Sequence, residues 1–443
     1  MIHPIEERYC RPGMRKIWEE ESKWAKCLSV EAALAKAQAD LGVIPKKDAV
    51  EIAKKADLEH VKVERIKEIE RETDHDIISM VRALSEKCDS KFVHFGATSN
   101  DITDTALALQ IKESIEILDK DLLELKKALI SLIKKTKTLV CMGRTHGQQA
   151  VPITYGLRFS IWAVEIERHI ERLSELKKRI LVGQMTGAVG TQAAMGPKAM
   201  QIQEKCMDYL GLAPVLVSTQ VIQRDRHAEF LQYLSLVAES LNKFGVNIRS
   251  WQRTEIGEVS EKFGKGQVGS STMSHKTNPI HMERVCGLSR VITSNSFTGL
   301  RNVSLWEERD LTNSSAERII IPESLILMDY ILSITVEALN GLEFNKENIR
   351  RNLELSKGLI MAERIMIELA RRGMDRQESH ELLRKLSMNA KASGLGLKEV
   401  LLSEKAVMKH ISAAELDSLM DPTTYIGTAI EQADAVLDVL EKR

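Results

Sequence analysis

The 443-residue sequence has few of the residues that interrupt long helices, with only 24 glycines and 9 prolines in the whole chain. Aromatic residues make up just 4% of it. Sheet proteins need frequent turns and favour aromatic and β-branched residues, so these shortages argue against a mainly β fold. The composition, 43% hydrophobic and 28% charged, is that of a soluble globular protein, and the length suits roughly two to four domains.

The chain also lacks an excess of either charge, because 63 Lys and Arg residues balance 63 Asp and Glu residues. A protein that binds a nucleic-acid backbone needs a surplus of positive charge or a long basic block. The sequence has neither, and we therefore predict no nucleic-acid partner.

Membrane and metal signals are missing as well. Residues 1–14 contain no apolar core of signal-peptide length, and no run of about 18 apolar residues occurs elsewhere. The six cysteines are scattered singly, without a C-x-x-C pair, which predicts neither a disulfide framework nor a zinc site. These absences predict a cytoplasmic protein that has no membrane partner and no metal. The cysteines are Cys10, Cys27, Cys88, Cys141, Cys206 and Cys286.

What the sequence does contain is a series of long segments with helical periodicity. Residues 104–137 include neither glycine nor proline, and their apolar residues recur at spacings of three and four. Similar spacing continues in four later segments, and five helices of this length predict a bundle. The apolar positions of the first segment are Ile111, Ile115, Leu118, Leu122, Leu125, Leu129 and Leu132. The later segments are 162–180, 234–251, 280–305 and 323–342.

The regions on either side carry shorter helical patterns. We predict an all-α fold with a small N-terminal helical domain at 1–98, a central long-helix bundle at 99–350 and a C-terminal helical domain at 351–443. Additional apolar residues on the first long helix predict a second packing surface, of the kind that often contacts another subunit. These residues are Ile117, Leu123 and Ile133.

Two polar clusters in the N-terminal third lie near predicted helix ends. Residues 73–76, Thr-Asp-His-Asp, precede an apolar run, so an ordinary helix cap explains them better than function does at this stage. Residues 94–101 place Thr98, Ser99 and Asn100 at the start of the first long helix. One of these side chains can cap the free N–H groups of the helix, and the remaining ones can hold a carboxylate at the positive end of the helix dipole.

Two further clusters lie in the central segment. In residues 143–149 a histidine, His146, stands beside a threonine and between glycines, which is poor core material and favours a functional role. Residues 264–279 combine glycines with two serines, a lysine and an asparagine. A flexible connection ending at Pro279 explains the glycines and the proline only. A mobile lid that carries a base and cationic donors explains the whole segment.

The fourth cluster, G-S-S-T-M-S-H-K-T-N-P, resembles the signature of the fumarase/aspartase superfamily, whose members release fumarate from succinyl compounds. Within that superfamily the chain resembles the adenylosuccinate lyase family through matches along most of its length. These are E-R-Y with R-P at 7–12, T-D-H-D at 73–76, H-F-G-A-T-S-N-D at 94–101, G-R-T-H-G-Q at 143–148, S-T-Q-V-I-Q-R-D-R-H at 218–227, W-E-E-R-D-L-T-N-S-S-A-E-R at 306–318 and D-P-T-T-Y-I-G at 421–427.

The resemblance implies a three-domain L-aspartase-like fold whose five-helix bundle joins a larger helical core in a homotetramer, with each active site shared between three subunits. It implies β-elimination of fumarate from adenylosuccinate, giving AMP, and from the succinyl-carboxamide ribotide intermediate of purine synthesis. A small nucleotide is the implied partner, and neither a metal nor an organic cofactor is needed.

The resemblance also implies roles for individual residues. Ser270 aligns with the catalytic base and His146 with the general acid, while Lys276 polarises the succinyl carboxylate, Glu283 orients His146, and His75 joins the catalytic set. An unassisted hydroxyl is a poor base, so Ser270 requires activation, for which Lys276 and a nearby helix N-terminus are candidates. The implied substrate-binding residues are Arg8, Tyr9, Asp74, Asp76, His94, Thr98, Ser99, Gln220, Ser271, Asn278, Arg284, Arg309, Ser314 and Arg318.

One departure and two alternatives accompany this interpretation. The family usually has proline where this chain has Ser274, which loosens the predicted lid without removing a functional group. Another lyase of the superfamily, such as argininosuccinate lyase, fumarase or aspartase, shares the same loop, although Arg8-Tyr9 and the 218–227 motif favour adenylosuccinate. A helical scaffold protein explains the heptads but leaves the four polar clusters without a role.

Overall fold

The computed structural model describes residues 3–262, 272–273 and 275–442. The described part is mostly helical, which confirms the predicted fold class at that level, and its strands pair into three small two-stranded sheets. Sheets β1–β2 and β5–β6 are antiparallel, and β3–β4 is parallel. The strands are β1 (Val140–Thr145), β2 (Gln148–Thr154), β3 (Val182–Gly183), β4 (Ala213–Pro214), β5 (Val259–Ser260) and β6 (Glu343–Phe344).

The chain divides into two compact units. The first consists of Met1–Glu124, Arg168–Asn242 and Arg284–Ile334, and the second of Leu125–Glu167, Lys243–Glu283 and Thr335–Arg443. In the described residues, five helices of 22 to 38 residues each contribute to both units. They are α6 (Ser99–Thr136), α7 (Tyr155–Ile180), α9 (Asp225–Gln252), α10 (Ile280–Arg301) and α11 (Thr312–Asn340), and each coincides with a segment of predicted helical periodicity.

Helix α6 shows why these segments are helical. It contains neither glycine nor proline, begins with an acidic residue in its first turn, Asp101, and ends with Lys134 and Lys135, as the helix dipole favours. All seven apolar residues of the predicted seam are at most 4% exposed. Ile133 is also fully buried, so it belongs to the core of this chain and not to a second surface, whereas Leu123 is 43% exposed.

Polar bonds join successive long helices within the first unit. They link α6 to α7, α7 to α9, α9 to α10 and α10 to α11, so the helices pack side by side in the order in which they occur in the chain. The bonded pairs are Lys177 with Asp119, Tyr233 Oη with the His169 carbonyl (3.1 Å), Gln232 Nε2 with the Ser296 carbonyl (3.0 Å), and Asn295 Nδ2 with Glu323 Oε2 (2.8 Å).

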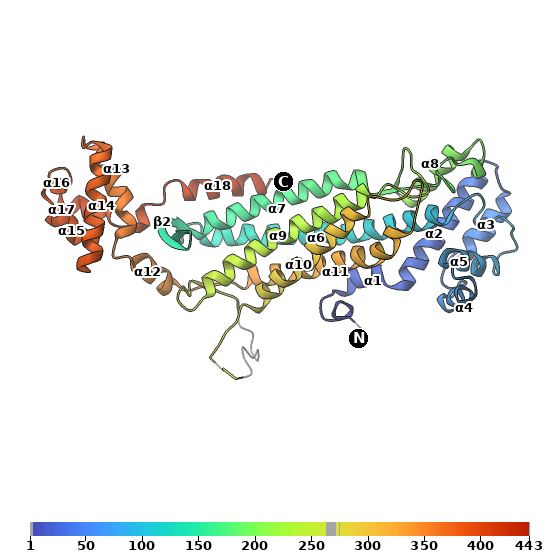
Figure 1. Cartoon of the computed structure of the whole chain (residues 1–443), viewed down its shortest axis with the longest axis horizontal. Coiled ribbons are helices and arrows are strands. Elements are labelled where there is room, and N and C mark those ends of the chain that lie inside the picture. The colour runs from blue at the N-terminus through green and yellow to red at the C-terminus, as the bar shows by residue number, and fades with distance from the viewer. Residues whose placement is uncertain (1–2, 263–271, 274, 443) are drawn as a thin grey trace. The chain divides into compact units, whose positions relative to one another are not determined.

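The first unit also contains shorter helices, most of which share one apolar core (Figure 1). Trp24, Leu28, Ile66, Met80 and Ile202 are among its buried residues. The elements are η1 (Pro4–Glu6), α1 (Pro12–Trp18), α2 (Glu20–Asp40), α3 (Lys46–Lys55), α4 (Val63–Thr73), α5 (Asp76–Ser85), η2 (Ala193–Met195) and α8 (Ala199–Leu210).

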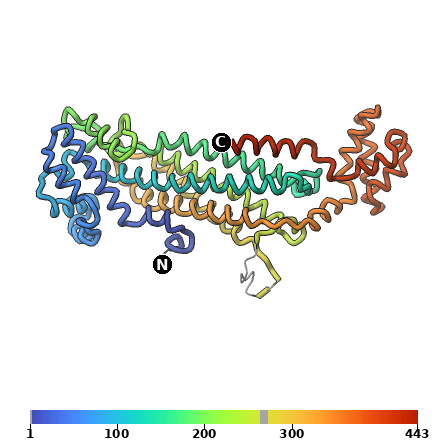
Figure 2. Tube along the Cα trace, turned by 180° about the vertical axis from the view of Figure 1, so that it is seen from behind, coloured from blue at the N-terminus to red at the C-terminus, as the bar shows by residue number. Residues whose placement is uncertain are grey.

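The second unit ends in a compact group of C-terminal helices with its own core, drawn in orange and red in Figure 2. Ile365, Leu369, Leu383, Leu401 and Leu416 are buried there. The elements of the group are η3 (Leu359–Met361), α13 (Ala362–Arg371), α14 (Arg376–Ser393), α15 (Leu397–Ser403), α16 (Lys405–Met408), α17 (Ala413–Leu419) and η4 (Pro422–Thr424). Helix α12 (Lys346–Glu354) precedes this group and contacts β1, and α18 (Ala429–Leu440) follows it and contacts β2.

Helix α11 is apolar enough to cross a membrane by length and composition, with a mean hydropathy of 1.8 over its most apolar window. However, 61% of that window is buried within the protein, including Ile321, Leu325 and Leu332. It also contains a fully buried carboxylate, Asp329, which pairs with Arg11 at 2.7 Å. These features identify α11 as a core helix of a soluble protein.

The hairpin β1–β2 was not predicted, because the sequence pattern indicated only a connection between two long helices at residues 143–149. Thr145 pairs with Gln148, which leaves His146 and Gly147 as a two-residue turn. Both have positive φ, 53° and 74°, as a type I′ turn requires. Glycine is the only residue type that fits at position 143, since a Cβ atom there would lie 2.3 Å from the Val151 carbonyl oxygen.

Candidate active site

The first unit contains a pocket of about 770 Å³ that gathers many of the predicted site residues. Asp74, His75 and Asp76 line it from the turn between α4 and α5, and Ser99 lines it from the first turn of α6. The segment before α11 supplies Arg309, and the first two turns of α11 supply Ser314 and Arg318. Residues that are more than 200 positions apart in the sequence therefore share one cavity.

The start of α6 provides the anion-binding end of a long helix dipole, and an arginine lies directly against it. Arg309 Nη1 donates to Gln220 Oε1 at 2.8 Å and to Ser99 Oγ at 3.3 Å. Gln220 Nε2 in turn donates to Thr98 Oγ1 at 3.4 Å. Burial lowers the pKa of Arg309, although a guanidinium remains charged at neutral pH. These four side chains form a polar group suited to a carboxylate or a phosphate.

A second cation in the pocket, Arg318, is held by a carboxylate. Its Nη2 lies 2.7 Å from Asp76 Oδ2, which Lys23 Nζ also approaches at 3.4 Å. Burial opposes the ionisation of Asp76, but Lys23 and Arg318 outweigh it and lower the pKa of this carboxyl group. The other oxygen, Oδ1, accepts the Ile77 amide at 2.8 Å. Asp76 therefore orients Arg318 and Lys23 while it begins α5.

The motif at residues 73–76 serves as helix caps and lines the pocket at the same time. Asp74, with φ 50°, is the left-handed cap that ends α4. His75 begins α5, where its Nδ1 accepts the Ile78 amide at 3.4 Å, and its side chain is 47% exposed. Left-handed backbone at a non-glycine residue is costly and often marks a functional site. The cap and the functional interpretations of this motif are thus compatible.

His94 is not part of the pocket lining. Its Nδ1 lies 2.6 Å from Glu31 Oε1, and the Glu31 side chain is 1% exposed. Burial opposes protonation of this imidazole, but the adjacent Glu31 carboxylate has the larger combined effect and raises the pKa of His94. Its backbone is also left-handed, with φ 60°. The structure therefore shows His94 as a partner of a buried carboxylate on α2.

The N-terminal residues Arg8 and Tyr9 lie outside the pocket lining in this chain. Arg8 Nε donates to Tyr9 Oη at 3.3 Å, and the Tyr9 ring packs edge-on against Tyr330. Two residues later, Arg11 anchors the segment, because its Nη1 lies 2.8 Å from Asp121 and 2.7 Å from Asp329. Burial and the neighbouring Asp121 raise the pKa of Asp329 well above its usual range.

In the second unit, His146 stands exposed at the tip of the β1–β2 hairpin. The base of the hairpin is held by Glu258, which is completely buried. Its carboxylate accepts from Arg144 Nη2 at 2.6 Å, Tyr155 Oη at 2.6 Å and Asn352 Nδ2 at 2.8 Å. The hydrogen bonds of Glu258 therefore hold the hairpin that carries His146 at a turn with left-handed backbone. Such a fixed position suits a side chain that transfers a proton.

The remaining predicted catalytic residues also belong to the second unit. Lys276 and Glu283 are exposed, and Asn278 is half-buried just before α10. Ser270 and Ser271 lie outside the described residues, as does most of the segment 264–279. Arg284, in the second turn of α10, is half-buried and belongs to the first unit. None of these described residues lines the pocket of the first unit.

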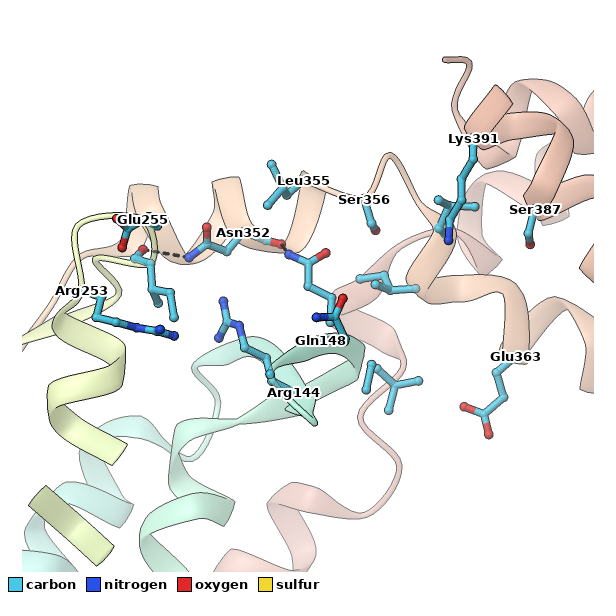
Figure 3. Close-up of a pocket in the computed structure, with 17 residues that line it drawn as sticks. Arg144, Gln148, Arg253, Glu255, Asn352, Leu355, Ser356, Glu363, Ser387 and Lys391 are labelled. Atoms are coloured by element: carbon cyan, nitrogen blue, oxygen red, sulfur yellow. Dashed lines mark hydrogen bonds between the residues drawn. The ribbon is translucent and has the colours of Figure 1, made fainter. Parts of the chain in front are cut away.

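A separate cavity of about 760 Å³ lies in the second unit beside the hairpin (Figure 3). Arg144 faces it from β1, Arg253 from the end of α9, and Lys391 from α14. Gly147 and Gln148 also line it, whereas His146 does not. The acidic residues Glu255 and Glu363 balance much of the positive charge, so the cavity has no strong preference for anions.

Sequence reasoning missed several residues of the pocket, because they were not among the polar clusters at helix ends. Lys23 and Cys27 come from the first half of α2, and Asp104 and Glu317 lie inside long helices. Arg224 falls within the 218–227 motif, but nothing in the sequence gave it a role of its own. In the described part of the chain, no group of three or more His, Cys, Asp or Glu residues could hold a metal ion.

Comparison with known proteins agrees with this arrangement. A family model described as Lyase matches residues 8–293, and one described as Adenylosuccinate lyase C-terminus matches residues 358–436. The chain is 56% identical to the adenylosuccinate lyase of Methanocaldococcus jannaschii, covering 100% of this chain and 96% of that protein. It is 54% identical to the adenylosuccinate lyase of Pyrococcus abyssi, covering 100% and 98%. The crystal structure of a fumarate lyase from Mesorhizobium sp. BNC1 matches with a TM-score of 0.91 and 31% identity, covering 97% of this chain and 98% of that one.

The helical fold is thus that of the fumarate lyase superfamily. Within it, the chain belongs to the adenylosuccinate lyase family. It is a lyase of purine biosynthesis that cleaves a C–N bond and acts on a nucleotide substrate. The activity predicted from the motifs is confirmed, and the other fumarate-releasing families are not supported.

Proposed function

We propose that the pocket of the first unit binds an anionic part of adenylosuccinate, and of the succinyl-carboxamide ribotide, before fumarate is eliminated. The observation that carries this proposal is the convergence of Arg309, Arg318 and Ser99 on one cavity at the N-terminus of α6, where Gln220 accepts a hydrogen bond from Arg309. The substrate has a phosphate and two carboxylates, while the whole chain has no net charge. Its binding therefore needs a local group of cations and N–H donors of this kind.

The chemistry requires four groups, which we assign as the sequence predicts. Ser270, as the alkoxide, removes a proton from the succinyl carbon next to a carboxylate, and the electron pair left there forms the C=C bond of fumarate. The C–N bond breaks, and His146 donates a proton to the departing nitrogen. Lys276 and Asn278 stabilise the charge that accumulates on the carboxylate, and Glu283 orients His146.

We further propose that the protein is a homotetramer whose sites take residues from three subunits. His146, Lys276 and Glu283 are exposed and lie outside the lining of the substrate pocket, so they are available to other copies of the chain. Exposed apolar residues on α10 and α11 offer surfaces for such contacts: Phe297 is 66% exposed and Ile319 is 63% exposed. The domain organisation 1–98, 99–350 and 351–443 and a cytoplasmic location complete the proposal.

The substrate is tested by incubating the purified protein with adenylosuccinate and following the absorbance change as AMP and fumarate form. Argininosuccinate, malate and aspartate serve as parallel substrates. We expect turnover with adenylosuccinate and with the carboxamide ribotide only. Turnover of argininosuccinate or malate, with no turnover of adenylosuccinate, would contradict the assignment.

The shared site is tested with two inactive variants. We expect Ser270→Ala and His146→Ala each to abolish turnover while the tetramer, measured by light scattering, stays intact. If the two residues of one site come from different subunits, mixing and reassembling the two variants restores part of the activity. Tetramers mixed in this way that remain inactive would contradict sharing between subunits.

A further inference from the structure

Arg224, just before α9, has its guanidinium enclosed by acceptors inside the first unit. Nη1 and Nη2 lie 2.7 and 2.9 Å from the two oxygens of Asp104, while Nε and Nη2 lie 3.0 and 3.2 Å from those of Glu317. Nη1 also donates to the Ile222 carbonyl at 2.6 Å. An arginine has five N–H donors, and these five hydrogen bonds use all of them. Although Arg224 lines the pocket, it has no donor left for a substrate.

The cluster is buried and carries an excess of negative charge. Arg224, Asp104 and Glu317 are 4%, 3% and 7% exposed, so one guanidinium serves two carboxylates out of contact with water. The adjacent His227 adds no charge at neutral pH, because burial and the neighbouring Arg224 lower its pKa to about 3. Buried ion clusters of this kind often stabilise a fold no better than apolar residues would, so their presence calls for a role other than stability.

The partners of Arg224 belong to three segments, and each segment carries one of the anion-binding side chains. Asp104 lies on α6 little more than one turn after Ser99, and Glu317 lies on α11 directly before Arg318. Ile222, whose carbonyl accepts from Arg224, is two residues after Gln220. The same guanidinium thus joins α6, residues 218–224 and α11.

The carboxylates of Asp104 and Glu317 also accept hydrogen bonds from the backbone and from neighbouring side chains, and so fix their positions. Asp104 Oδ2 accepts the Ile222 amide at 2.9 Å, and Oδ1 accepts Asn100 Nδ2 at 3.2 Å. Glu317 Oε2 accepts Asn313 Nδ2 at 3.0 Å. The geometry of the binding group therefore depends on the cluster beneath it.

We propose that Arg224 is a positioning residue, which keeps Ser99, Gln220 and Arg318 at the separations that the anionic part of the substrate requires. This role rests on the proposed function of the pocket. Arg224 acts through the segments that it joins and does not contact the substrate itself. Replacing Arg224 should therefore weaken substrate binding more than it slows the proton-transfer steps.

The test compares Arg224→Lys with the unmodified enzyme. A lysine keeps the charge but has only three donors, which cannot replace the five hydrogen bonds of the guanidinium. We expect KM for adenylosuccinate to rise about 10- to 100-fold, with kcat within about threefold, because displacing positioning groups by about 1 Å has effects of this size. Binding of AMP, measured by calorimetry, should weaken in parallel.

The matched control is Lys126→Met, which breaks a different buried ion pair, Lys126 with Glu167 at 2.7 Å, away from the pocket residues. It should lower the melting temperature to a similar extent and leave KM unchanged. Glu317→Gln, a milder change, serves as a second variant if Arg224→Lys does not fold, and it should raise KM by a smaller factor.

Two results would overturn the proposal in distinguishable ways. A variant at Arg224 or Glu317 that is less stable but keeps normal KM and AMP affinity would show that the cluster is structural only. Absence of turnover of adenylosuccinate by the unmodified protein would overturn the proposed function of the pocket, and this role with it.

Discussion

The two units of the chain hold their predicted site residues in contrasting ways. In the first unit, Arg309, Arg318 and Asp76 are each held by a hydrogen bond or an ion pair around one pocket. In the second unit, His146 and Lys276 stand exposed, on a hairpin turn and just before a helix. The difference teaches that the predicted binding residues of the pocket are preorganised within one chain, whereas the proposed general acid and Lys276 are exposed at its surface.

Left-handed backbone occurs at predicted site residues in both units. In the described residues, six non-glycine residues have positive φ, and three of them, Asp74, His94 and His146, are predicted site residues. A left-handed conformation costs free energy at such residues and persists only where the surroundings enforce it. For His146 the enforcement comes from the two-residue hairpin, which requires positive φ at both turn positions.

The largest effect is expected at the exposed histidine of the second unit. His146→Gln should lower kcat by about 10²- to 10⁴-fold, the usual contribution of a positioned general acid, with little change in KM. Stopped-flow or steady-state absorbance measurements separate the two constants. A variant that raised KM and kept kcat would place His146 among the binding residues and break the contrast between the units.

The next effect is expected at the arginine of the first unit. Arg309→Ala removes a charged donor from the group with Gln220 and Ser99, so KM should rise about 10- to 100-fold while kcat changes much less. Arg350→Ala, at a site 70% exposed on α12, is the matched control and should change neither constant. An unchanged KM in Arg309→Ala would contradict a role of this pocket in binding.

A smaller effect is expected from the backbone that presents His146. Gly143→Ala would place a Cβ atom 2.3 Å from the Val151 carbonyl, so the hairpin must shift, at a cost of about 1–3 kcal/mol in the free energy of unfolding. Activity should fall as the turn is displaced.

Gly287→Ala, on α10, is the comparison for that variant, because nothing lies within 4 Å of the added atom. Alanine favours helix, so the free energy of unfolding should stay the same or rise by up to about 1 kcal/mol. Thermal unfolding measures both variants, and equal destabilisation of the two would show that close packing in the hairpin is not the reason for Gly143.

The smallest effect concerns the buried pair of Glu31 and His94 in the first unit. The folded-state pKa of His94 is raised above the unfolded value, so the pair stabilises the protein below about pH 6.5 and this contribution is lost as the pH rises through the folded pKa. Glu31→Gln should therefore be less stable than the unmodified protein by about 1 kcal/mol at pH 6. The difference in melting temperature between Glu31→Gln and the unmodified protein should become smaller towards pH 9. A difference that does not depend on pH would argue against a charged His94.

The sequence predicted the parts of the fold that follow from periodicity. The apolar seam of α6 is strictly repeated and free of glycine and proline, so its helix was predicted to within a few residues of its ends. The hairpin β1–β2 was not predicted, because its strands are short compared with the long helices around it. Its turn also depends on positive φ at His146, which no local sequence pattern indicates.

The proposed binding residues near helix ends stand out in the sequence, whereas the network beneath them does not. Ser99, Arg309 and Arg318 occur in polar motifs that stand out from the helical pattern. Arg224 and Asp104 lie in helical surroundings where charged residues ordinarily face water. Only the packing of three segments around one guanidinium reveals that they are buried.

The central claim is that binding and proton transfer belong to separate groups of residues in this chain. Calorimetric titration of His146→Gln with adenylosuccinate tests it most directly, since the inactive variant leaves the substrate intact. The claim predicts a dissociation constant within about threefold of the KM of the active enzyme, provided that its chemistry is slow relative to dissociation. A variant that is correctly folded and tetrameric but no longer binds adenylosuccinate would contradict it.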